Sequence, residues 1–258
     1  MTVQVGVDGA VGTITLARAD KRNAVTYEMW VALEAACREL AHHPQVRVVV
    51  LRGAGDHFCA GADITELLAE RPATVPSFMD VNMAAEHALA SLGKPTLAVV
   101  QGDCIGGGAA LAIDCDLRIA VAGARFGITP AKLGVVYPPA SLERVVRLLG
   151  PSAKRLLFTG DLIDTTEAHR IGLVDEVCEA HAVEARVAEL CATLASRSLL
   201  TQAATKEMVA AVLEHGSVPS AMADAWQHEV AVSGELAEGV AAFGERRAPQ
   251  FPWRGRHS

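Results

Sequence analysis

Aromatic residues are scarce in this chain of 258 residues, where they make up 4% of the sequence, although 51% of its residues are hydrophobic. The core is therefore expected to consist mainly of Ala, Val, Leu and Ile. No apolar run reaches the roughly 18 to 20 residues that span a bilayer. The first sixteen residues also lack the charged and apolar regions of a signal peptide. We expect a globular protein of the cytoplasm that does not enter a membrane.

An excess of positive charge is also missing, because 23 Lys and Arg residues face 30 Asp and Glu residues. A net charge of −7 gives no reason to expect nucleic acid or an anionic membrane as a partner. The six cysteines form no C-x-x-C pair and have no paired histidines. We interpret them as small buried residues and predict no metal site.

Two kinds of pattern divide the chain. Short β-branched runs such as residues 46–51 and 96–100 predict buried strands, and residues 27–42 and 77–92 have helical periodicity. The last part of the chain is almost entirely helical in pattern. We therefore expect an α/β core over residues 1–195 and a helical extension over residues 196–258.

Two glycine-rich turns, at residues 58–64 and 102–109, each lead into a predicted helix. Free backbone N–H groups at a helix start favour negative charge, and small residues leave them open to a ligand. The second turn does not follow the dinucleotide pattern G-x-G-x-x-G, and the chain has no G-x-x-x-x-G-K-S/T phosphate loop. We therefore interpret the two turns as a binding site for an oxygen atom that gains negative charge.

Several motifs in a fixed order identify a family. They are Lys21-Arg22-Asn23-Ala24, Phe58 to Ile64, Lys94-Pro95 followed by Gly102 and Gly106 to Gly108, and Cys115-Asp116-Leu117-Arg118. Together they resemble the crotonase superfamily, which is the enoyl-CoA hydratase/isomerase family, over essentially the whole chain. One departure is Ala19, which stands where a proline is usual.

The resemblance implies a crotonase-type α/β fold, a spiral of ββα units with a helical C-terminal region. It implies an acyl-CoA thioester as substrate, so that coenzyme A is part of the substrate and no separate cofactor is needed. It also implies a homotrimer or a dimer of trimers, with the C-terminal extension serving trimerisation and covering the CoA.

The resemblance also assigns site residues. The backbone N–H groups of Ala62 and Gly107 would hold the thioester oxygen as the thioester becomes an enolate. Such fixed donors stabilise a transition state strongly. The substrate and CoA contacts fall on Lys21, Arg22, Ala24, Ala60, Asp63, Ile64, Gly106 and Pro130.

The two glutamates of the family's hydratases are missing. Ala110 and Pro130 stand at their positions, and neither side chain can carry a proton. Hydration by the two-glutamate mechanism is therefore not expected. One alternative is a hydratase or isomerase with another base, for which His87 and Glu143 are candidates. Another is a catalytically silent protein that binds acyl-CoA.

The stretch from Thr129 to Tyr137 is similar to the corresponding part of methylmalonyl-CoA decarboxylase, in which the tyrosine belongs to the active site. Decarboxylation forms an enolate directly and needs no base. Tyr137 is then either an assisting residue or an ordinary packed aromatic. We expect the acyl pocket to include Leu67, Met79, Met83 and Val136.

Overall fold

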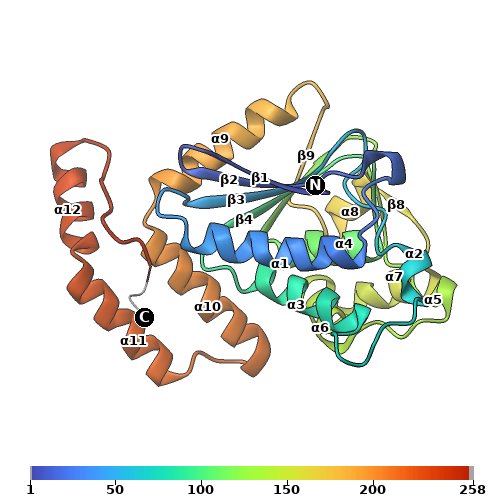
Figure 1. The fold of residues 1–258 in the computed structure, drawn as a ribbon. Coiled ribbons are helices and arrows are strands. Elements are labelled where there is room, and N and C mark those ends of the chain that lie inside the picture. The colour runs from blue at the N-terminus through green and yellow to red at the C-terminus, as the bar shows by residue number, and fades with distance from the viewer. Residues whose placement is uncertain (1, 256–258) are drawn as a thin grey trace.

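A six-stranded sheet lies at the centre of the computed structural model, which describes residues 2–255 (Figure 1). Its strands, in spatial order, are β1 (Val3–Asp8), β2 (Val11–Leu16), β3 (Val48–Gly53), β4 (Thr96–Val100), β6 (Leu117–Val121) and β9 (Glu176–Cys178). The β1–β2 hairpin is antiparallel, and all the other neighbouring pairs are parallel. Within the described residues, no helix is long and apolar enough to cross a membrane.

Helices cover both faces of this sheet. Helix α9 (Val183–Ser196) lies on one face, and α1 (Tyr27–His42) and α3 (Phe78–Ala90) lie on the other (Figure 1). Successive side chains of β3 alternate between the two cores: Val48 and Val50 pack with α9, whereas Val49 and Leu51 belong to the core beneath α1 and α3. Burial on both faces explains why the central strands β3 and β4 are largely apolar runs.

Hydrogen bonds with side chains fix both ends of α1. Thr26 begins the helix by accepting a hydrogen bond from the backbone N–H of Met29 at 3.3 Å. At the other end, the buried Lys94 Nζ donates to the carbonyl oxygens of Leu40 and His43 at 2.7 and 2.9 Å. The lysine charge thereby meets the negative end of the helix dipole. The predicted range of α1, residues 27–42, is confirmed.

A second, three-stranded sheet was not expected from the sequence. It consists of β5 (Asp103–Ile105), β7 (Arg125–Gly127) and β8 (Ile163–Asp164). The buried Asp103 carboxylate pairs with Arg125 at 2.6 Å and ties the first two strands together. Because β5 leads directly into α4 (Gly107–Asp114), this small sheet fixes the start of that helix.

Short helices complete the core. They are α2 (Ile64–Leu67), α5 (Pro130–Leu133), α6 (Pro139–Leu149), α7 (Ala153–Thr159) and α8 (Thr165–Arg170), with 3-10 turns η1 (Ala19–Lys21) and η2 (Gly150–Ser152). The last three helices, α10 (Leu199–His215), α11 (Ser220–Ser233) and α12 (Glu235–Glu245), project from the body (Figure 1). Leu200, Ala203 and Trp226 form a separate small core that joins α10 to α11. The expected helical C-terminal region is confirmed.

Candidate active site

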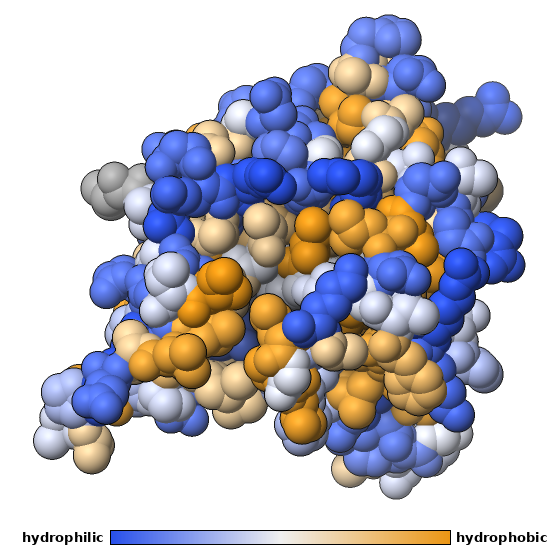
Figure 2. Space-filling view, turned by 90° about the vertical axis from the view of Figure 1, so that its right-hand side faces the viewer, coloured by the Kyte–Doolittle hydropathy of each residue, from blue (hydrophilic) through white to orange (hydrophobic). Residues whose placement is uncertain are grey.

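A pocket of about 170 Å³ lies where the two glycine-rich turns meet α2, α3 and α5. Its walls are mostly apolar, with side chains from Trp30, Leu67, Phe78 and Met79 among them. Figure 2 views the end of the molecule that carries α2, α5 and α7, where apolar residues gather in patches around a hollowed surface. Ile64, Leu133 and Val135 are exposed on this surface and also line the pocket.

The two backbone amides expected to act as donors, those of Ala62 and Gly107, line this one pocket. Across residues 2–255, no backbone hydrogen bond has either of them as donor. Gly107 is the first residue of α4, where a helix leaves its N–H groups unsatisfied. A Cβ atom added at Gly107 would lie 3.3 Å from the Ala62 nitrogen, and one added at Gly61 would lie 3.2 Å from the Gly107 nitrogen. The two amides are therefore close together, and the glycines keep them uncovered.

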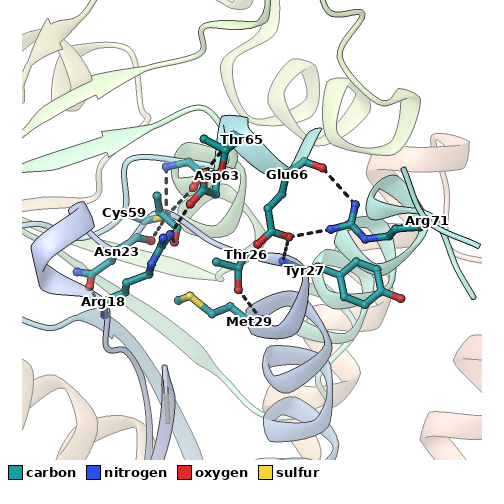
Figure 3. Close-up of polar contacts among 12 residues, drawn as sticks. Arg18, Asn23, Thr26, Tyr27, Met29, Cys59, Asp63, Thr65, Glu66 and Arg71 are labelled. Carbon is teal, nitrogen blue, oxygen red and sulfur yellow. Dashed lines mark hydrogen bonds and ion pairs between the residues drawn. The ribbon is translucent and has the colours of Figure 1, made fainter. Parts of the chain in front are cut away.

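The segment that the family resemblance assigned to CoA lies beside the first turn. The Ala60 N–H donates to the Arg22 carbonyl at 2.9 Å, and Val25 pairs with Ala62 in a parallel bridge. The buried Asn23 side chain donates to the carbonyls of Ala54 and His57 at 2.9 and 2.7 Å. The Ala60 and Val25 contacts hold residues 22–25 against residues 60–63, and the close-up shows Asn23 beside Cys59, whose thiol donates to the Asn23 carbonyl (Figure 3).

The remaining residues assigned to CoA differ in position. Ala60, Ile64, Gly106 and Pro130 line the pocket. Lys21, Arg22, Ala24 and Asp63 lie outside its wall, with Lys21 and Arg22 exposed on the adjacent surface.

Asp63 stabilises the local fold. It caps α2 through Thr65, and its carboxylate pairs with Arg18 at 2.6 Å (Figure 3). The Thr65 hydroxyl first and the Arg18 guanidinium second lower the pKa of this carboxyl below its ordinary value. The Asp63 carboxylate is thus bound by Thr65 and Arg18 of the same chain.

A polar latch, made by Glu66, Arg71 and Tyr27, holds the loop that connects the pocket residues Leu67 and Phe78. Glu66 accepts a hydrogen bond from the Tyr27 backbone N–H at 3.0 Å and pairs with Arg71 at 2.8 Å (Figure 3). The Arg71 guanidinium also lies 4.5 Å from the centre of the Tyr27 ring. The Tyr27 hydroxyl donates to the Pro76 carbonyl at 3.2 Å. Residues 66–76 are therefore tied to the first turn of α1.

One carboxyl group in the pocket was missed by the sequence analysis. Glu86 lies on α3, is only 3% exposed, and lines the pocket together with Asn82. The buried face of α3 is made by Phe78, Val81, Asn82, Ala85, Glu86 and Leu89, which recur three or four positions apart. A glutamate on a mostly apolar helical stripe was the available signal. Burial raises the pKa of its carboxyl, against hydrogen bonds that lower it.

Other expected residues lie elsewhere. His87 and Glu143, the two candidate bases, are exposed and outside the pocket. Glu143 pairs with Arg147 on the surface of α6. Leu67 and Met79 line the pocket as expected, but Met83 and Val136 do not, and Val136 is 89% exposed. The expectation for these two was wrong because Met83 lies on the exposed side of α3 and Val136 points to solvent from a loop.

Tyr137 does line the pocket, and its hydroxyl oxygen is buried without a hydrogen-bond partner among the described residues. Burial and the nearby carboxyls of Glu86 and Asp114 raise its pKa well above the ordinary value, so the phenol stays neutral. Ala110 is buried on α4 and Pro130 opens α5. The side chains at these two positions supply no titratable group.

Comparison with known proteins places these observations in a family. The sequence profile of the Enoyl-CoA hydratase/isomerase family matches residues 6–254. A protein of Thermus thermophilus described as a putative enoyl-CoA hydratase is 35% identical, covering 94% of this chain and 98% of the relative. An (E)-benzylidenesuccinyl-CoA hydratase of Thauera aromatica is 32% identical, covering 97% and 99% of the two chains.

Solved structures agree with the sequence comparison. A crystal structure described as an enoyl-CoA hydratase/carnithine racemase from Magnetospirillum magneticum superimposes with a TM-score of 0.91 at 32% identity, covering 97% of this chain and 95% of the other. A putative family protein from Hyphomonas neptunium also has a TM-score of 0.91, at 30% identity and 98% coverage of both chains. The crotonase-type fold expected from the sequence is therefore confirmed.

Proposed function

Because the chain belongs to the enoyl-CoA hydratase/isomerase family, we propose that it binds an acyl-CoA thioester and stabilises the enolate of that thioester between the amides of Ala62 and Gly107. The observation that carries the proposal is the pair of uncovered amides at the wall of one apolar pocket. Two fixed donors lower the energy of an oxygen that gains charge, because no solvent has to reorganise during the reaction.

The shape of the site supports a thioester as the ligand. Apolar walls from α1, α2 and α3 suit an acyl chain, and the adjacent exposed surface carries Lys21 and Arg22. Cationic side chains at that place can meet the phosphates of CoA. The start of α4 adds the positive end of a helix dipole on the side where the thioester oxygen would lie.

Gly107→Ala tests the proposed role of the amide pair. Gly107 has no left-handed backbone conformation, so alanine is compatible with the chain, but its methyl group would lie 3.3 Å from the Ala62 nitrogen. We expect turnover of the active acyl-CoA to fall by about 10²- to 10³-fold. The matched control is Gly93→Ala, whose added Cβ has no atom within 4 Å and should leave turnover unchanged.

The substrate panel for this test contains a 3-enoyl-CoA, crotonyl-CoA and methylmalonyl-CoA, with products identified by mass spectrometry. Turnover of at least one ester by the unmodified protein, lost in Gly107→Ala, is the expected result. Tight binding of every ester with no turnover would instead identify a catalytically silent binding protein.

Decarboxylation is a second candidate, favoured by the buried Tyr137 hydroxyl in the pocket, which has no hydrogen-bond partner within residues 2–255. In that reaction the bond between the α-carbon and the carboxylate breaks, CO₂ leaves, and the electron pair forms the enolate. The neutral phenol could then return a proton to the α-carbon. Release of CO₂ from methylmalonyl-CoA by the unmodified protein, reduced in Tyr137→Phe, is the result expected for this reaction.

A further inference from the structure

A buried group of charged and polar side chains adjoins the pocket and is used by none of the steps above. Its members are Glu86 on α3, Asp114 on α4, and Ser141 and Arg144 on α6. Glu86 is the only carboxylate among the described residues that line the pocket. The usual glutamate positions of the family are occupied by Ala110 and Pro130, so any proton transfer by a carboxylate in this pocket falls to Glu86.

Three side chains hold the Glu86 carboxylate in one orientation. Asn82 donates to Oε1 at 3.0 Å, Ser141 donates to Oε2 at 2.6 Å, and the Arg144 guanidinium lies 3.4 Å from Oε2. Two of these donors share one oxygen, whereas Oε1 accepts a single hydrogen bond from residues 2–255. Since a carboxylate oxygen can accept two, Oε1 keeps an acceptor direction.

Asp114 and Arg144 determine which carboxyl group is charged. Arg144 lies 3.1 Å from Asp114 Oδ1 and so stands between two buried carboxyls. One guanidinium cannot balance two carboxylates in a buried place. Burial and the charge of Glu86 raise the pKa of Asp114 well above its ordinary value. Both Glu86 oxygens accept hydrogen bonds, whereas Asp114 Oδ2 has no partner among the described residues, so the extra proton is favoured on Asp114. The ionised group that faces the pocket is then Glu86, beside the neutral phenol of Tyr137.

We infer that Glu86 is the acid–base residue of this enzyme and that its reaction moves a carbon–carbon double bond within an enoyl-CoA. The inference rests on the proposed function, because the enolate must be held by Ala62 and Gly107. A single carboxylate suits a double-bond shift, in which the group that removes a proton also returns it. Hydration by two glutamates would require a second carboxylate in the pocket.

The atoms balance in two steps. The Glu86 carboxylate takes a proton from C2 of a 3-enoyl-CoA, and the electron pair of that C–H bond forms a dienolate whose oxygen lies between the two amides. The protonated Glu86 then donates the same proton to C4. The C3–C4 double bond becomes a C2–C3 double bond, and the carboxylate is regenerated.

The test compares Glu86→Gln, which keeps the size and the hydrogen-bonding shape of the side chain, with His87→Gln, its exposed neighbour on the same helix. Isomerisation of 3-hexenoyl-CoA is followed by the absorbance of the conjugated product. Thermal unfolding and calorimetric binding of the ester to each variant show whether it is folded and whether its pocket is intact.

We expect the kcat of Glu86→Gln to fall by about 10²- to 10⁴-fold, with folding and ester binding retained. We expect His87→Gln to match the unmodified protein and Glu86→Asp to recover part of the rate. The kcat/KM of the unmodified protein should rise with pH as the carboxyl ionises, above the ordinary range of glutamate, and the residual rate of Glu86→Gln should lack this rise.

Two results would overturn the inference. One is a Glu86→Gln variant that isomerises as fast as His87→Gln. The other is an unmodified protein that decarboxylates methylmalonyl-CoA, or hydrates crotonyl-CoA, but does not shift a double bond. Either result leaves the proposed enolate chemistry standing. If the unmodified protein converted none of the acyl-CoA esters, the proposed function itself would be rejected.

Discussion

At the residue scale, the glycines of this site could be predicted from the sequence, whereas its buried glutamate could not. Gly61 and Gly107 can be found in the sequence because only glycine leaves two neighbouring amides uncovered, and the structure brings these amides together. Glu86 was overlooked because no motif contains it. Its importance comes from burial on a helical stripe and from partners that lie 55 and 58 positions away, Ser141 and Arg144. Contacts of that kind depend on tertiary structure.

The buried Glu86 carboxyl should cost stability, and the cost should depend on pH. Its pKa in the folded protein is raised above the ordinary value of 4.5, which it regains on unfolding. The folded state therefore binds the proton more tightly, so stability is greatest below the ordinary pKa and falls as pH rises through the raised pKa. Glu86→Gln cannot titrate, and this fall should be absent.

Denaturant unfolding at about pH 5 and about pH 8 measures this difference. We expect the stability of Glu86→Gln, relative to the unmodified protein, to be greater at the higher pH. Glu143→Gln, at an exposed surface pair, serves as the control and should show little change. A variant that loses stability relative to the unmodified protein as pH rises would contradict the account.

At the scale of elements, long periodic segments were predictable and short ones were not. The ranges of α1 and β4 follow from apolar periodicity, whereas the three-residue strands β5 and β7 fall below any useful periodicity. Those short strands nevertheless fix the start of α4 and thus the Gly107 amide. The part of the pocket wall made by Ile64, Leu67, Phe78 and Met79 depends in the same way on the polar latch, because Arg71 joins Glu66 to Tyr27 in the loop between these residues.

Arg71→Gln should loosen this wall. The variant loses the ion pair with Glu66 and the contact with the Tyr27 ring, which together are worth about 1 kcal/mol at a half-buried site. We expect faster proteolysis within residues 68–77 and a higher KM for the acyl-CoA, with little change in kcat. Arg170→Gln, in an exposed pair with Glu167, is the control. Equal proteolysis of the two variants would exclude the latch.

At the scale of the whole molecule, the C-terminal helices leave an apolar stripe uncovered. Leu236, Val240 and Phe243 recur on α12 three or four positions apart, and Phe243 is 87% exposed. An exposed stripe of this kind indicates an association surface. It supports the expectation, made from the family resemblance, that the chain assembles as a homotrimer or a dimer of trimers.

Light scattering coupled to size-exclusion chromatography measures this assembly. We expect the unmodified protein to have three or six times the mass of one chain and Phe243→Glu to shift toward the monomer, because a charge on the stripe opposes its burial. Phe158→Glu, at an exposed phenylalanine on α7, tests whether any new surface charge has this effect. A monomeric unmodified protein would refute the expected assembly.

Formation of the enolate by removal of an α-proton is the central claim, and exchange of the α-protons of butyryl-CoA with deuterated water tests it most directly, because no bond other than C–H needs to break. Mass spectrometry should show deuterium entering the α-carbon in the unmodified protein, and the rate should fall by about 10²- to 10³-fold in Gly107→Ala and not in Gly93→Ala. Binding of butyryl-CoA to the unmodified protein without exchange would contradict removal of the α-proton at this site, and exchange in Gly107→Ala as fast as in Gly93→Ala would contradict stabilisation of the enolate by the amide pair.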